Sequence, residues 1–266
     1  IKKYTLNPMI QHIKSEIYIF LTAVMFFTRI PIFITIPYSP EMLNASTRYF
    51  TIIGLLIGLI AAGIFILASY ILPTPVAIVL SMLCTIYVTG AFHEDGFADF
   101  CDGFGGGSTP EKILTIMKDS RLGTYGTIGL LSMLTLKYIS IFYIPVPYIP
   151  ILLITAHVGS RALPVFIIHY MHYVQDSDNS KSKPIGKRSS IAAPIIAIST
   201  FCISFAWNPY IGLLCIVCLG CVYILFSRYI RKKIGGYTGD VLGALQQISE
   251  VTIYFTAMAF FYTTHI

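Results

Sequence analysis

The strongest constraint on the fold is a series of apolar segments whose lengths approach those needed to cross a membrane. A helix needs roughly 20 predominantly apolar residues to cross the hydrocarbon core. Such segments lie at about 16–37, 49–72, 74–92, 127–144, 148–169, 191–206, 209–227 and 241–264. Charged residues make up 11% of the chain, whereas soluble proteins carry about 25%. The sequence shows none of the short alternating strands of an outer-membrane barrel. We therefore predict an all-α, polytopic membrane protein in which residues 1–266 form a single domain.

The connections between these segments are of two kinds, which predicts the topology. Short proline-containing turns at 72–75, 145–150 and 207–210 hold no Lys or Arg. Longer polar loops at 93–126, 171–190 and 228–240 hold Lys112, Lys118, Arg121, Lys181, Lys183, Lys187, Arg188, Arg228, Arg231, Lys232 and Lys233. Short cytoplasmic loops carry an excess of Lys and Arg. Placing the long loops in the cytoplasm puts every proline turn on the opposite side, which predicts about seven transmembrane helices.

The first apolar segment, 16–37, differs from the others because Arg29 and Pro31 lie within it. A charged residue near the bilayer centre costs roughly 2.5–3.5 kcal/mol on insertion scales. We therefore expect a re-entrant or interfacial segment here, with a full span as the alternative. The formal net charge of +6 is distributed over loops, and no basic domain or arm is present to follow a phosphate backbone. A nucleic-acid partner is not expected.

The stretch "HEDGFADFCDGFGGG" at 93–107 concentrates carboxylates in a chain that has only 12 acidic residues. Asp95, Asp99 and Asp102 are spaced to lie along one face of a helix, with Glu94 flanking them. Like charges at this spacing repel each other, so a compensating cation is expected. Mg²⁺ prefers carboxylate oxygens, waters and substrate phosphates. We predict that these four carboxylates bind one or two Mg²⁺ ions.

Residues around the acidic stretch are candidates for phosphate binding. Gly105 and Gly106 allow close approach of the backbone to a phosphate group. Next along the chain, Lys118, Asp119 and Arg121 precede the following apolar segment, and the two cations suit a diphosphate. The simpler alternatives are a solvated acidic face, a glycine linker and basic residues that anchor the membrane boundary. His93 is either a ligand of the site or a bystander.

Four further residues extend the candidate substrate site. Thr238 and Asp240 open the last apolar segment, where Asp240 is either a helix N-cap or a further ligand. Arg29 and Arg161 lie within apolar segments. Each of these arginines needs an acidic or phosphate partner, because an unpaired charge is costly there.

Four motifs spread over nearly the whole chain carry a resemblance to a known family. "GAFHEDGFADFCDGFGG", "MKDSRLGTYG", "FFTRIP" and "GGYTGDVLGA" together resemble the cobalamin synthase family, formally the adenosylcobinamide-GDP ribazoletransferases. The resemblance implies a Mg²⁺-dependent enzyme of a prokaryotic cytoplasmic (inner) membrane. It implies that a ribose hydroxyl of α-ribazole, or of its 5′-phosphate, attacks the corrinoid-proximal phosphoryl group of adenosylcobinamide-GDP, and that GMP leaves. It also implies contact with the lipid bilayer, with a homo-oligomer and other enzymes of cobalamin biosynthesis as candidate partners.

The family's motifs carry over to particular residues. They match Glu94, Asp95, Asp99 and Asp102, then Lys118, Asp119 and Arg121, and finally Thr238 and Asp240. The expected mechanism is direct in-line phosphoryl transfer, with the general base left unassigned among the carboxylates. Two other functions remain as alternatives. "DFCDG" at 99–103 is also similar to the start of the CDP-alcohol phosphotransferase motif, although the Ala-Arg pair and the later aspartates of that motif are missing. A cation transporter could instead use the acidic cluster as its ion site.

Overall fold

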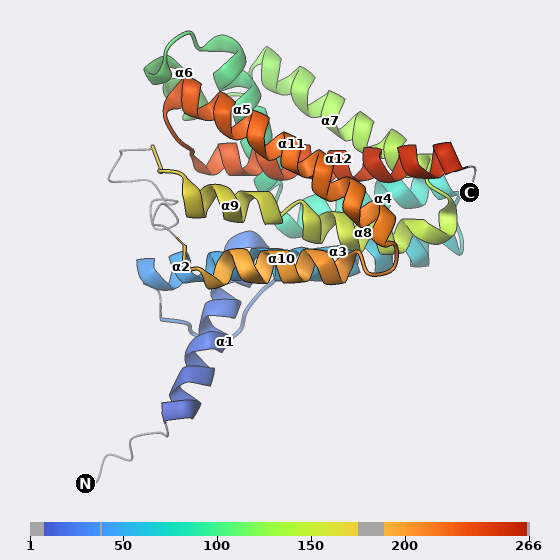
Figure 1. Cartoon of the computed structure of the whole chain (residues 1–266), viewed down its shortest axis with the longest axis horizontal. Coiled ribbons are helices and arrows are strands. Elements are labelled where there is room, and N and C mark those ends of the chain that lie inside the picture. Colours follow the sequence, from blue (N-terminus) through green and yellow to red (C-terminus); the bar gives the residue numbers. More distant parts are fainter. Residues whose placement is uncertain (1–7, 38, 175–188, 265–266) are drawn as a thin grey trace.

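The computed structural model describes residues 8–37, 39–174 and 189–264, and over these residues the chain is a bundle of helices (Figure 1). The helices are α1 Pro8–Phe27, α2 Pro40–Ser46, α3 Phe50–Ser69, α4 Thr74–Thr89, α5 Phe92–Gly106, α6 Pro110–Met117, α7 Thr124–Phe142, α8 Ile149–Gly159, α9 Ala162–Tyr170, α10 Ala192–Ser204, α11 Pro209–Ile234 and α12 Gly239–Thr264. Short 3₁₀ turns at Thr47–Tyr49 and Val146–Tyr148 precede α3 and α8. The prediction of an all-α fold is confirmed.

The helix starts follow from local sequence. Pro occupies the first turn of α2, α4, α6, α8 and α11, where its missing N–H would have no helical partner. Side chains of Ser39, Thr109 and Asn208 accept hydrogen bonds from the first turns of α2, α6 and α11, which satisfies donors that a helix leaves open at its start. The proline-marked turns predicted from the sequence therefore end one helix and start the next.

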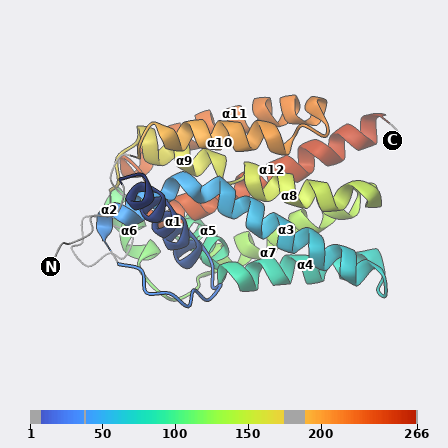
Figure 2. The ribbon, with the colours of Figure 1, turned by 90° about the horizontal axis from the view of Figure 1, so that it is seen from below.

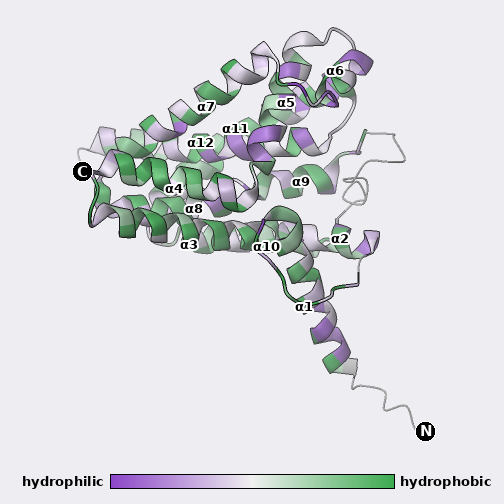
Figure 3. Ribbon diagram, turned by 180° about the vertical axis from the view of Figure 1, so that it is seen from behind, coloured by the Kyte–Doolittle hydropathy of each residue, from purple (hydrophilic) through white to green (hydrophobic). Residues whose placement is uncertain are grey.

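The two kinds of connection lie at opposite ends of the bundle (Figures 1 and 2). The α3–α4, α7–α8 and α10–α11 turns lie at the end that also holds the C-terminus. The α5–α6–α7 region, the end of α9 and the α11–α12 connection lie at the other end, where hydrophilic residues gather on α5 and α6 (Figure 3). The expected separation of long polar loops from proline turns is present. Lys181, Lys183, Lys187 and Arg188 lie outside the described residues.

Fewer helices than predicted are long and apolar enough to cross a membrane. Within the described residues there are four such spans, Pro40–Ser69, Thr124–Phe142, Val146–Tyr170 and Pro209–Ile234. A fifth is reached if the pair α4 and α5, bent by 87°, is taken as one. The sequence predicted about seven because it also included the segments at 191–206 and 241–264. The first forms α10, of only 13 residues, and the second forms α12, whose first half is polar.

The first apolar segment does not form one continuous helix. Helix α1 ends at Phe27, so Arg29 and Pro31 lie in the non-helical stretch that follows it. Within the described residues, α1 is not among the candidate spans. The expectation that this segment is re-entrant or interfacial stays a prediction.

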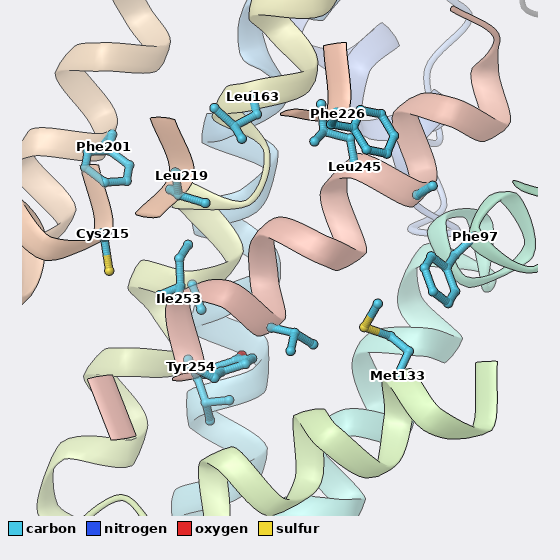
Figure 4. Close-up of a cluster of buried hydrophobic side chains, with 14 of the residues drawn as sticks. Phe97, Met133, Leu163, Phe201, Cys215, Leu219, Phe226, Leu245, Ile253 and Tyr254 are labelled. Carbon is cyan, nitrogen blue, oxygen red and sulfur yellow. The ribbon is translucent and has the colours of Figure 1, made fainter. Parts of the chain in front are cut away.

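Helix α12 lies at the centre of the bundle and forms most of the core with α5, α7, α8 and α11. Phe97, Met133, Leu245, Ile253 and Tyr254 come from α5, α7 and α12 and are buried in this core (Figure 4). Burying a side chain of this size stabilises a water-soluble fold by about 1.5–3 kcal/mol, whereas in a membrane close packing and polar contacts between helices take over this role. A second apolar cluster joins α1, α3, α9 and α10.

A sharp corner between α4 and α5 determines where the acidic stretch lies. Gly90 and Ala91 both have left-handed backbone conformations, with φ of 67° and 56°. The Arg29 backbone N–H donates a hydrogen bond to the Val88 carbonyl at 2.7 Å, and the Arg29 side chain packs so closely on Gly90 that a Cβ there would clash with it. The corner sends α5 away from the axis of α4 at 87°.

Candidate active site

The acidic helix α5 packs directly against the start of α12. A Cβ added to Gly96 would lie 3.0 Å from the Asp240 Cα, and one added to Gly243 would lie 3.2 Å from the His93 carbonyl oxygen. As α12 is followed from Asp240 to Gly243, its contact moves backwards along α5, so the two helices run antiparallel. This contact brings the two motifs at 93–107 and 235–244 together, as a single site requires.

Three carboxylates occur together at this contact. The Asp99 carboxylate experiences repulsion from Asp240, Asp95 and Asp102, with Asp240 the strongest of the three. Asp95 is exposed, whereas Asp99 and Asp240 are half-buried. Within the described residues, no Lys, Arg or His forms an ion pair with Asp95, Asp99 or Asp240. The negative charge of this cluster is therefore not compensated by the protein in the described part of the chain.

The start of α12 shows that Asp240 is not the residue that caps this helix. The buried Thr238 hydroxyl accepts a hydrogen bond from the Val241 N–H at 3.3 Å, which makes Thr238 the N-cap. Asp240 follows in the first turn of α12, where the helix dipole favours a negative charge. The preceding residue, Tyr237, is held by backbone hydrogen bonds with His172 and Val174. The position of Asp240 is therefore fixed by the hydrogen bonds of Tyr237 before it and by the helix cap at Thr238.

Asp102 has a different environment from the other carboxylates on its helix. Its two oxygens accept hydrogen bonds from the backbone N–H groups of Gly123 and Gly126 at 2.7 and 2.8 Å. These groups belong to the start of α7, which has no capping side chain of its own. Asp102 therefore caps α7 from α5, and a charge at this end of a helix is favourable.

Lys118, Asp119 and Arg121 lie in the connection between α6 and α7, directly before the segment that Asp102 holds. The Arg121 guanidinium donates to both oxygens of Asp119, with Nη2 to Oδ2 at 2.6 Å. The hydrogen bonds from Arg121 lower the pKa of Asp119 to about 2, so Asp119 carries its charge at any physiological pH. Lys118 and Arg121 are exposed, and the phosphate-binding role predicted for them stays a prediction.

Gly105 and Gly106 are helical, whereas the sequence suggested a glycine-rich loop. They belong to the last turn of α5 instead of an open loop, and both are exposed. A Cβ at Gly105 would lie 2.6 Å from the Tyr125 ring on α7, so glycine allows α5 and α7 to approach each other here. The role predicted for these two glycines in phosphate binding stays a prediction.

Arg29 and Arg161 differ strongly in their exposure to solvent. Arg29 is exposed at the α4–α5 corner. Arg161 is 1% exposed; its Nη1 donates to the His157 carbonyl oxygen at 2.9 Å, and its guanidinium lies 5.7 Å from the centre of the Phe50 ring. Its Nε has no partner among the described residues. The acidic partner expected for Arg161 is present only at longer range, in Glu250 and Glu94.

Glu94 and His93 point into the protein, unlike Asp95. Glu94 is 8% exposed, and its Oε1 accepts a hydrogen bond from Gln247 at 2.9 Å. His93 is 2% exposed and stacks on Phe50. Glu94 Oε2 and His93 Nε2 have no partner among the described residues. Both residues line a small cavity between α5, α8 and α12.

A buried polar network below this cavity was not predicted as part of the site. Lys137 of α7 forms an ion pair with Glu250 of α12 at 3.1 Å, and both side chains are almost completely buried. Gln246 and Gln247 connect this pair to Glu94. The available signal was a charged residue within each of two apolar segments, which marks a functional site more often than a structural one.

The carboxylates at the α5–α12 contact suit an ion such as Mg²⁺, which takes only part of its ligands from the protein, better than a metal whose ligands all come from protein side chains. Within the described residues no group of three or more His, Cys, Asp or Glu side chains is arranged to hold a metal ion. Mg²⁺ is usually bound through one or two carboxylates, with waters and substrate phosphates completing its coordination. Asp95, Asp99 and Asp240, which have no counter-ion in the described part of the chain, are suitable donors of this kind.

Comparison with known proteins places the chain in a family. Residues 19–258 match the family described as cobalamin-5-phosphate synthase. An adenosylcobinamide-GDP ribazoletransferase of Shewanella frigidimarina is 44% identical over 92% of this chain and 95% of its own length. Enzymes of the same name from Vibrio parahaemolyticus and Leptothrix cholodnii are 40% and 39% identical over 94% and 90% of this chain, and cover 95% and 94% of their own lengths. No solved structure matches the chain. The resemblance carried by the four sequence motifs is confirmed, and the chain belongs to the cobalamin-5-phosphate synthase family.

Proposed function

We propose that this chain joins adenosylcobinamide-GDP to α-ribazole, or to α-ribazole 5′-phosphate, and releases GMP. A ribose hydroxyl would form a new bond to the corrinoid-proximal phosphorus, and the bond from that phosphorus to the oxygen bridging to GMP would break. The hydroxyl proton would pass to a base, and the electron pair of the broken bond would leave with GMP. The names of the relatives support this reaction.

The observation that carries the proposal is the cluster of carboxylates without counter-ions where α5 meets α12. Asp95, Asp99 and Asp240 repel one another, and repulsion of this kind favours binding of a cation. A diphosphate substrate brings further negative charge to the same place. We therefore propose that the site works with Mg²⁺, which when bound would neutralise the diphosphate and the departing GMP.

The remaining residues of the site have distinct roles in this proposal. Asp95, Asp99 and Asp240 would hold the ion, and Asp102 would keep the α6–α7 connection next to α5 through its hydrogen bonds with Gly123 and Gly126. Lys118 and Arg121 would then contact the phosphates of the substrate. Such contacts act on charge that develops in the transition state.

We also propose that the end of the bundle that carries the site faces the cytoplasm of a prokaryotic inner membrane. The basic residues Lys112, Lys118, Arg121, Arg228 and Arg231 occur at this end, as do Lys232 and Lys233. The turns at the opposite end lack Lys and Arg. This asymmetry is the one expected from the positive-inside rule.

The proposal is tested by measuring GMP release from the full chain in lipid nanodiscs. We expect GMP to appear only when adenosylcobinamide-GDP, α-ribazole or its 5′-phosphate, and Mg²⁺ are all present, and to stop after chelation. GMP release without α-ribazole would indicate a hydrolase and would contradict the transfer. Release of CMP from a CDP-alcohol, or cation flux without GMP release, would support the phospholipid or transport alternative in place of this function.

A further inference from the structure

The Gln247 side chain bridges a buried cation and a buried anion. Its Oε1 accepts a hydrogen bond from Lys137 Nζ at 2.9 Å, and its Nε2 donates to Glu94 Oε1 at 2.9 Å. A lysine ammonium only donates and a carboxylate only accepts. The amide therefore has a single possible orientation, because exchanging its oxygen and nitrogen would break both hydrogen bonds.

The far side of this bridge is anchored by several helices. Glu250 accepts hydrogen bonds from Gln246 Nε2 at 2.9 Å and from the Tyr254 hydroxyl at 3.3 Å, and it pairs with Lys137 of α7. Gln246 also donates to Ser160 between α8 and α9 at 2.9 Å. Removing one partner from a buried polar network of this kind is costly, because the remaining groups lose their partners. The network is therefore a fixed point within the bundle.

The direct contact between α5 and α12 is formed by apolar side chains and by close glycine contacts, neither of which fixes the direction of a polar side chain. Gly96 meets the backbone of Asp240, and Gly243 meets the backbone of His93. Glycine contacts allow close approach, but they offer no interlocking side chains to oppose sliding or rotation of one helix on the other. Within the described residues, the Glu94–Gln247 hydrogen bond is the one side-chain hydrogen bond that joins α5 to α12, and it supplies the directional constraint that apolar packing does not.

The charges of the network also separate this role from ion transport. Two basic residues, Lys137 and Arg161, and two acidic residues, Glu94 and Glu250, line the same cavity. An ion-transport site needs space for the ion and an unbalanced charge that attracts it, whereas this cavity is comparable in size to a single water molecule. The balanced set of side chains fits a structural anchor.

We propose that Gln247 is a positioning residue that fixes Glu94, and through it sets the rotation and register of α5 so that Asp95 and Asp99 face Asp240. Asp95 follows Glu94 directly, and Asp99 lies on the same face one turn later, so a fixed Glu94 determines where both carboxylates point. This inference rests on the proposed function of the acidic cluster as a Mg²⁺ site. It assigns Glu94 an anchoring role in place of the metal-ligand role predicted from the sequence.

The test measures Mn²⁺ binding to the full chain in nanodiscs by electron paramagnetic resonance, together with Mg²⁺-dependent GMP release. Gln247→Leu keeps a similar volume but removes both hydrogen bonds. We expect it to weaken Mn²⁺ binding about 10–100-fold, as loss of an orienting partner behind a metal ligand does. Ser249→Ala is the matched control, because Ser249 is equally buried on α12 and bonds only to the Leu245 carbonyl of its own helix. It should leave Mn²⁺ binding unchanged.

A swap of the two side chains separates anchoring from direct metal binding. In Glu94→Gln combined with Gln247→Glu, the new glutamate accepts from Lys137 and from the new amide at position 94, and the total charge is unchanged. Recovery of Mn²⁺ binding and turnover relative to either single variant would support positioning. Loss in the swap as severe as in Glu94→Gln alone would show that the Glu94 charge acts directly, and would overturn the inference. The swap also decides the matter if Gln247→Leu does not fold.

Two further outcomes distinguish this inference from the proposed function. If the wild-type chain binds Mn²⁺ and Gln247→Leu binds it equally well with equal turnover, the positioning role is wrong and the proposed function stands. If the wild-type chain binds no Mn²⁺ and Mg²⁺ does not stimulate GMP release, the proposed metal site itself is wrong, and the positioning role falls with it.

Discussion

At the scale of single residues, neighbouring carboxylates on α5 have very different surroundings. Asp95 is exposed, whereas Glu94, directly before it, is 8% exposed and bonded to Gln247. Both carboxylate oxygens of Asp102 accept hydrogen bonds from the start of α7. Within the described residues, Asp99 has neither a cation nor a backbone N–H as a partner, and three other carboxylates repel it. Of the four acids, Asp99 has the environment that most favours a bound cation.

We expect Asp99→Asn to reduce turnover by at least ~100-fold, a loss typical of removing one group that stabilises transition-state charge. The substitution keeps the shape of the side chain but removes a negative charge from the cluster, so the fold should be retained. GMP release and the thermal unfolding temperature in nanodiscs would be measured together. Glu111→Gln, an exposed acid in the first turn of α6, is the control and should keep full activity. Full activity in Asp99→Asn would remove Asp99 from the site.

The sequence was sufficient to identify the acidic residues but not the partners of each. Spacing of three or four residues predicts a shared helical face, and the four acids do lie on one helix. The spacing contains no information on Lys137 and Gln247, which lie 110 residues apart in the chain yet form a hydrogen bond. Contacts of this range depend on how the helices pack, so Glu94 and Asp102 looked equivalent to Asp95 and Asp99.

At the scale of helices, the site depends on how closely α5 approaches α12. Gly96 is the critical residue, because a Cβ there would lie 3.0 Å from the Asp240 Cα and 3.2 Å from its carbonyl oxygen. Both are backbone atoms of a helix start and cannot move aside as a flexible side chain would. The distance between the two carboxylate-bearing helices is therefore set by the absence of one side chain.

We expect Gly96→Ala to separate α5 from α12, with a loss of stability of about 1–3 kcal/mol from overpacking and a decrease in turnover. The gain from a better helix former, about 1 kcal/mol, offsets only part of this. Gly63→Ala on α3 is the matched control, because a Cβ there would meet no atom within 4 Å. It should raise stability slightly and leave turnover unchanged. Equal turnover and stability in both variants would contradict a functional role for the α5–α12 approach.

The positions of most helices could be predicted from apolar segments and proline turns, but their number as membrane spans could not. Helix α12 has 26 residues, yet its first half contains Gln246, Gln247 and Glu250, which are buried against other helices. Helix α10 is apolar but has only 13 residues. The polar first half of α12 and the short length of α10 account for the smaller number of candidate spans.

At the scale of the whole molecule, the two ends of the bundle are predicted to face different compartments. In a chain whose native cysteines have been replaced, Glu111→Cys on α6 would mark the end with the site, and Tyr210→Cys, in the first turn of α11, would mark the opposite end. Both positions are exposed. A maleimide that cannot cross membranes should label position 210 in intact cells and position 111 only in inside-out vesicles.

Labelling of both positions from the same side would contradict the proposed topology, and the reverse pattern would place the site outside the cytoplasm. Permeabilised membranes, in which both positions should react, provide the control for reactivity of the two cysteines. GMP release by each variant would show that the replacement of the native cysteines has left the protein functional.

The corner at Gly90 and Ala91 also determines where Asp102 lies relative to the end of the bundle. If α5 continued α4 in a straight line, Asp102 would lie about 20 Å beyond the end of α4, at 1.5 Å for each residue. The bend of 87° between α4 and α5 instead places α5 across the end of the bundle. In the proposed function, a bulky reactant would therefore meet the carboxylates at the end of the bundle itself, and not on a helix that extends beyond the bundle.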